Sequence, residues 1–77
     1  MSNSRLKWQC RRGMRELDVL LSGYLDEQYA QSGQSEKEAF QRLLGLSDPE
    51  INGYLLGGIV PADPEIANVV TRLRGRT

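Results

Sequence analysis

Turn-forming residues recur so regularly along this chain that no element between them can be long. Glycine, proline and serine-glycine signals stand at Gly13, at 32–33, from 45 to 49, at 57–58 and from 61 to 64. They divide the sequence into five short pieces. Apolar residues in these pieces recur every three or four positions, and few alternate with period two. The spacing therefore predicts an all-α fold, a compact bundle of about five short helices.

Helix boundaries follow from capping signals. We expect helices from about Ser4 to Arg12, from Met14 to Gln31, from a Ser35–Glu38 capping box to Gly45, from Asp48-Pro49 to Gly57-Gly58, and onward from Asp63-Pro64. Three of the pieces are shorter than the roughly 12–15 residues that an isolated helix needs in water, so mutual packing must hold them. We expect Trp8, Phe40 and Tyr54 inside, with the Leu, Ile and Val stripes. Along the second helix, Met14, Leu17, Leu21, Tyr24 and Leu25 define the inward face.

The chain is too small for a deep catalytic cleft. Its 77 residues predict a single domain, 1–77, with flexible ends at 1–4 and 75–77. Histidine, the commonest general base and metal ligand, is absent from the sequence, and no phosphate-cradling glycine motif is present. We therefore expect no catalytic residue, no metal site and no cofactor bound by the chain itself. Cys10 could be a thiolate activated by neighbouring Arg and Lys residues, but a small apolar residue filling a gap under Trp8 is favoured.

Targeting signals are also missing from the sequence. No stretch approaches the roughly 18 apolar residues of a membrane span, and the start lacks the apolar region of a secretory signal. The single cysteine suits a reducing compartment. These features predict a soluble, cytoplasmic protein, monomeric and without membrane insertion.

Charge is balanced overall but unevenly distributed. Residues 1–15 and 66–77 carry basic residues and no acid, whereas all ten acids lie between Glu16 and Glu65, where Lys37 and Arg42 are the only basic residues. Such a chain suits an oriented electrostatic encounter with a partner. Equally, the basic ends could neutralise the acidic middle within the fold.

The densest chemical feature is the segment from Arg11 to Asp18, at the join of the first two helices. Projected at 100° per residue, Glu16 and Val19 fall opposite the apolar face, so Arg and Glu side chains would flank a small exposed apolar patch, as at the centre of many interfaces. Structural explanations are available too. Gly13 could be a left-handed cap, Glu16 a first-turn acid paired with Arg12, and Asp18 an acceptor for neighbouring backbone.

The run Trp8-x-Cys10-Arg11-Arg12-Gly13-Met14-x-Glu16-Leu17-Asp18 resembles the signature of the succinate dehydrogenase flavinylation factors. The likeness continues through Glu38-x-Phe40-x-Arg42-Leu43-Leu44, Asp48-Pro49-Glu50, Tyr54-Leu55 and Pro61-Ala62-Asp63, and spans about residues 5–74. Tyr54 is a departure, since the family often has Trp at this position, and it puts the packing of the fourth helix in question.

The resemblance implies a five-helix assembly factor. Such factors bind the flavoprotein subunit of succinate dehydrogenase, and in many bacteria that of fumarate reductase. They promote covalent attachment of FAD to a histidine of that client, so FAD belongs to the client. The family's activity maps onto Arg12, Gly13 and Glu16, which Arg11 and Asp18 flank. These five residues form the predicted partner-binding site.

Two other functions compete with this one. The Arg and Lys residues of 1–15 could contact nucleic-acid phosphates, although zero net charge and an acidic middle argue against it. A small helical antitoxin or inhibitor could use the same surface to block a partner. The identity of a co-purified partner separates these alternatives.

Overall fold

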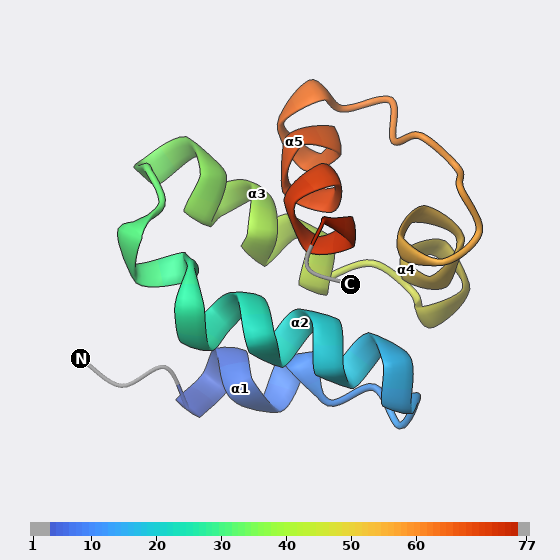
Figure 1. The fold of residues 1–77 in the computed structure, drawn as a ribbon, viewed down its shortest axis with the longest axis horizontal. Coiled ribbons are helices and arrows are strands. Elements are labelled where there is room, and N and C mark those ends of the chain that lie inside the picture. Colours follow the sequence, from blue (N-terminus) through green and yellow to red (C-terminus); the bar gives the residue numbers. More distant parts are fainter. Residues whose placement is uncertain (1–3, 76–77) are drawn as a thin grey trace.

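The computed structural model describes residues 4–75, which form five α-helices, one short 3-10 helix and no strand (Figure 1). The elements are α1 (Ser4–Cys10), α2 (Arg15–Glu27), η1 (Tyr29–Gln31, the 3-10 turn), α3 (Gln34–Leu44), α4 (Asp48–Leu55) and α5 (Pro64–Arg74). The predicted all-α bundle of about five short helices is confirmed. Of the ends expected to be flexible, residues 1–3 and 76–77 lie outside the described residues, Ser4 begins α1 and Gly75 caps α5.

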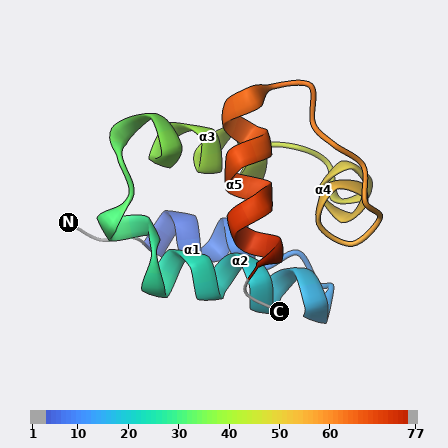
Figure 2. The same cartoon turned by 45° about the horizontal axis from the view of Figure 1, so that its top comes forward.

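The helices form two pairs with α4 at one end. α1 and α2 lie side by side and run in opposite directions, joined at the turn through Gly13 (Figure 1). The most extensive interhelical contact joins α3 and α5. α5 crosses this assembly so that its C-terminal part reaches α2, as Figure 2 shows. α4 contacts both α2 and α5, which places it beside the start of α2.

The core is built from the predicted apolar stripes. Leu17, Leu21 and Tyr24 of α2 are fully buried, and so is Phe40 of α3. The Tyr24 and Phe40 ring centroids are 4.6 Å apart, within the range of favourable aromatic pairs. Because each helix is short, this shared core rather than local propensity stabilises the fold.

Two large side chains that we expected inside are not there. Trp8 is 73% exposed, because Leu6 and Cys10 form the inward face of α1 and Trp8 stands on the other side. Met14 is 37% exposed because it precedes α2 in extended backbone, so helical spacing does not place its side chain. Tyr54, which we also expected inside, is only partly buried and packs against the core.

Helix starts were predicted correctly at α5 and wrongly at α3. Asp63 caps α5 by accepting from the backbone N–H of Glu65 at 2.9 Å. Gly33 is the N-cap of α3, so Ser35 lies within the helix and the capping box expected there is wrong.

At α4 the cap lies one residue earlier than we predicted. Ser47 holds it, with its hydroxyl accepting from Glu50 N and the Glu50 carboxylate reaching back. The carboxylate of Asp48 is consequently available for a contact elsewhere.

Candidate protein-docking site

The α1–α2 join turns sharply at Gly13. Gly13 has φ +78°, in the left-handed region where residues with a side chain are strained, so its predicted left-handed conformation is confirmed. The predicted cap of the first helix is wrong, because α1 ends at Cys10, three residues before Gly13. A Cβ added to Gly13 would have no atom of the rest of the protein within 4 Å, so the space beside this residue is open to solvent. The exposed glycine therefore offers bare backbone to anything that approaches.

The Arg12 side chain points into the protein and not out of it. Its Nε donates to Asp48 Oδ1 at 2.8 Å, and the side chain is only 16% exposed. Its two terminal nitrogens donate to the backbone oxygens of Leu44 at 2.9 Å, Leu46 at 2.6 Å and Gln9 at 3.1 Å. One guanidinium thus fastens the α1–α2 join to the connection between α3 and α4. The Arg12–Glu16 pair considered from sequence is replaced by this clamp.

Asp18 completes the clamp from the first turns of α2. Its Oδ1 accepts from the backbone N–H of Arg12 at 2.7 Å, as we predicted for a neighbouring backbone donor. Two of the five predicted site residues, Arg12 and Asp18, are therefore engaged with the fold itself. Arg11, Gly13 and Glu16 are exposed.

Glu16 borders a small apolar hollow. The hollow has a volume of about 230 Å³ and is lined by Arg15, Glu16, Val19, Leu20 and Leu56. Val19 is 64% exposed and Leu56 is 43% exposed, so an apolar floor lies open beside a carboxylate and a guanidinium. The exposed Glu16 and Val19 agree with the helical projection. Leu56 comes from the end of α4, 40 positions beyond Glu16, and no spacing rule could have assigned it.

Charge is only partly neutralised within the fold. Arg12 pairs with Asp48 and Arg72 pairs with Glu36, so both basic ends of the chain contribute to ion pairs with the acidic middle. Within residues 4–75, Arg5, Lys7 and Arg11 form no ion pair. Neutralisation within the fold is therefore confirmed in part, the exposed surface of α1 is positive, and the oriented encounter with a partner stays a prediction.

Cys10 is a buried residue of the core, and its surroundings do not favour a thiolate. It is fully buried, and burial followed by the negative charge of Asp26 raises the pKa of its thiol to about 11. A thiol with so high a pKa is protonated at neutral pH and a poor nucleophile. The favoured role of a small apolar residue in the core is confirmed, but the exposed Trp8 is not part of that core.

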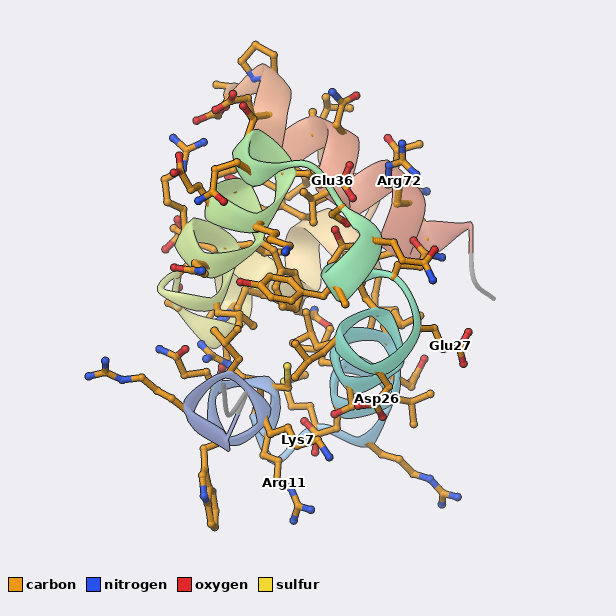
Figure 3. All side chains as sticks on the ribbon, turned by 90° about the vertical axis from the view of Figure 1, so that its left-hand side faces the viewer. Lys7, Arg11, Asp26, Glu27, Glu36 and Arg72 are labelled. Carbon is orange, nitrogen blue, oxygen red and sulfur yellow. The ribbon has the colours of Figure 1, made fainter. Side chains whose placement is uncertain are left out.

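A second polar cluster, which the sequence did not reveal, joins α2, α3 and α5. Glu36 accepts hydrogen bonds from Tyr24 at 2.5 Å and Ser32 at 2.8 Å, and pairs with Arg72 at 3.0 Å. Glu36 and Arg72 lie together on the side opposite Lys7 and Arg11 in Figure 3. Burial would raise the pKa of Glu36, but the Tyr24 and Ser32 hydroxyls and the Arg72 charge lower it below its usual value. This cluster stabilises the fold away from the join.

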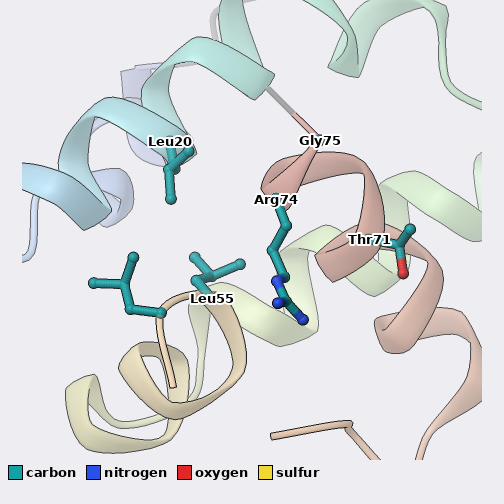
Figure 4. Close-up of a pocket in the computed structure, with 6 residues that line it drawn as sticks. Leu20, Leu55, Thr71, Arg74 and Gly75 are labelled. Atoms are coloured by element: carbon teal, nitrogen blue, oxygen red, sulfur yellow. The ribbon is translucent and has the colours of Figure 1, made fainter. Parts of the chain in front are cut away.

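A larger hollow lies between α2, α4 and the end of α5. It has a volume of about 510 Å³ and is lined by Leu20, Leu55, Leu56, Thr71, Arg74 and Gly75 (Figure 4). It shares Leu20 and Leu56 with the hollow beside Glu16.

The described residues contain no cluster of three or more His, Cys, Asp and Glu that could hold a metal ion. Among the same residues, no helix combines the length and apolar character needed to cross a membrane.

The exposed Gly13 turn, the guanidinium of Arg11 and the small apolar hollow beside Glu16 together have the composition of a protein-binding surface. Comparison with known sequences makes the assignment specific. The chain belongs to the family described as flavinator of succinate dehydrogenase, whose model matches residues 4–77.

Individual relatives cover almost the whole chain. It is 43% identical over 76 residues to the FAD assembly factor SdhE of Shewanella oneidensis, covering 99% of this chain and 93% of that protein. It is 44% identical over 70 residues to the protein of the same name from Methylococcus capsulatus, covering 91% and 84%. The corresponding Coxiella burnetii protein is 34% identical over 74 residues, covering 96% and 90%. These matches favour an assembly factor over a nucleic-acid-binding module or an antitoxin.

Proposed function

We propose that this protein binds the flavoprotein subunit of succinate dehydrogenase and promotes the covalent attachment of FAD to it. Family membership supports the client and the process. The observation that carries the site is the exposed Gly13 turn, held by the Arg12 clamp, with Glu16 exposed on the first turn of α2. The flavoprotein of fumarate reductase is a second client in the same proposal.

The five predicted site residues then divide into two roles. Arg11, Gly13 and Glu16 contact the client: Gly13 allows close approach of the client backbone, Arg11 meets acidic or carbonyl groups, and Glu16 accepts hydrogen bonds. Arg12 and Asp18 position those three by holding the join. The apolar hollow beside Glu16 receives one apolar side chain of the client.

Docking accelerates attachment by alignment. In this proposal the factor holds a client arrangement in which the accepting histidine faces the flavin, and the bond-forming chemistry is that of the cofactor. FAD stays in the client, and the factor acts as a cytoplasmic monomer. The open hollows at the surface of residues 4–75 support the placement of FAD in the client, because a dinucleotide normally binds in a deep cleft that encloses most of its surface.

The test replaces motif residues in cells that lack their own factor. Gly13→Arg should abolish covalent flavin on the client, because the new side chain projects from the turn into the docking surface. Glu16→Ala should reduce it strongly. In-gel flavin fluorescence of the client measures both.

Three controls separate docking from folding. Gly58→Ala places a side chain at φ +77°, the same strain as at Gly13, and should cost about 1–2 kcal/mol of stability without loss of flavinylation. Gly33→Arg adds the large side chain where a Cβ also meets nothing within 4 Å, at the start of α3. Glu38→Ala removes an exposed acid of α3. Normal client flavinylation by folded Gly13→Arg and Glu16→Ala variants would refute the proposal.

A further inference from the structure

Trp8 lies on the solvent-exposed side of α1. The helix has seven residues, and Leu6 and Cys10 are the side chains that it turns toward the core. Trp8 is the only tryptophan of the sequence and is 73% exposed. Nothing in the packing of the fold requires an indole at this position, since any good helix former would serve there.

The surroundings of Trp8 are cationic. The Arg11 guanidinium lies 5.9 Å from the centroid of the indole, and Arg5 and Lys7 are exposed on the same short helix. Figure 3 shows Lys7 and Arg11 leaving α1 on the side away from α3 and α5. Residues 4–15 contain no acid, and the ion pairs formed within residues 4–75 leave these three cations without an acidic partner.

The contact between the Arg11 guanidinium and the indole does not explain why a tryptophan is exposed at this position. A cation–π contact at the limit of about 6 Å in an exposed place contributes little, and the rest of the indole surface still meets water. Trp and Arg together are the residues that dominate binding at the centres of protein interfaces. An indole surrounded by cations is complementary to an apolar recess with carboxylates at its rim.

We infer that the outer face of α1 is a second contact surface for the client, on which Trp8 enters an apolar recess in an acidic region of the flavoprotein subunit. The inference rests on the proposed function, because it takes that subunit as the partner. A lipid surface fits less well, since helices that lie on membranes present a broad apolar face. Among residues 5–10 of α1, Trp8 is the one exposed apolar side chain.

The single tryptophan allows a direct test with the full chain. Protein labelled with 5-fluorotryptophan reports on Trp8 alone by fluorine NMR, and its signal should shift or broaden when the apo flavoprotein subunit is added. Trp8→Ala should weaken binding by about 30-fold or more in calorimetry, and Trp8→Phe should recover part of that loss. The contribution of the surrounding cations should make wild-type binding weaken as salt is raised.

The matched control is Val60→Ala, which shortens an apolar side chain that is 76% exposed in the loop after α4. It should bind as the wild type does. Because Trp8 is exposed, Trp8→Ala should keep the thermal midpoint within about 3 °C of wild type, which separates a binding loss from a folding loss.

Each result has a distinct meaning. If wild type binds and Gly13→Arg does not, but Trp8→Ala binds normally, the Trp8 inference is wrong and the proposed function stands. If wild type does not bind the subunit, both are wrong. A fluorine signal that responds to phosphatidylglycerol vesicles or to a DNA duplex, and not to the subunit, overturns the inference in favour of a lipid or nucleic-acid surface.

Discussion

At the scale of single residues, Arg12 has a role that its place in the motif does not suggest. In the sequence it is one of three neighbouring basic residues between 11 and 15, and any of them could contact a partner. In the structure its guanidinium holds the carbonyls of Leu44 and Leu46 and the carboxylate of Asp48. A residue tied to activity can therefore act by fixing the position of its neighbours.

Replacing Arg12 by Lys tests this role. An ammonium keeps the charge but lacks the planar fork that reaches four separate acceptors, so Arg12→Lys should lower the free energy of unfolding by about 2 kcal/mol. Arg11→Lys, which alters an exposed neighbour, should change it by less than about 0.5 kcal/mol. Urea unfolding followed by circular dichroism measures both. If the two variants were equally stable, the hydrogen bonds of the Arg12 guanidinium would not hold the α1–α2 join in place.

At the scale of elements, two serines that look alike in sequence differ in the structure. Each is followed three residues later by Glu, the pattern of a capping box. Ser47 caps α4 through Glu50, but Ser35 lies inside α3 because Gly33 precedes it as the cap. Ser47→Ala should therefore cost about 1 kcal/mol of stability, whereas Ser35→Ala should be neutral or slightly stabilising. Thermal melts of both variants decide it, and a larger loss at Ser35 would mean that α3 starts later than Gln34.

Local sequence rules predicted the elements better than the contacts between them. The stripe of α2 and the Asp63 cap are properties of neighbouring residues, and both are confirmed except for Met14 at the start of the stripe. The Arg12–Asp48 pair joins residues 36 positions apart, so periodicity carries no information about it. The prediction that Trp8 is buried was wrong because it relied on the size of the indole. The position of Trp8 on α1, opposite the inward-facing Leu6 and Cys10, exposes it instead.

At the scale of the whole molecule, a thiol and a phenol hydroxyl within the core make the stability of the fold depend on pH in the alkaline range. Burial, with the hydrogen bond to Glu36, raises the pKa of Tyr24 from 10.0 to about 12. Burial also raises the pKa of Cys10 from 9.0 to about 11. Across this interval the folded protein holds protons that the unfolded chain releases, so the stabilisation is complete below about pH 9 and is lost as pH rises toward 12.

The free energy of unfolding should therefore fall above about pH 9, with each group contributing at most about 1.4 kcal/mol per pH unit while it titrates. Cys10→Ala should be less stable at pH 7, because it leaves a small void, yet lose less stability between pH 9 and 11 than wild type does. Tyr24→Phe should flatten the decline from pH 10 upward. Urea unfolding at half-unit pH steps from 7 to 11.5 measures these slopes. Parallel curves for wild type and both variants would mean that neither the thiol nor the phenol has its pKa raised by folding.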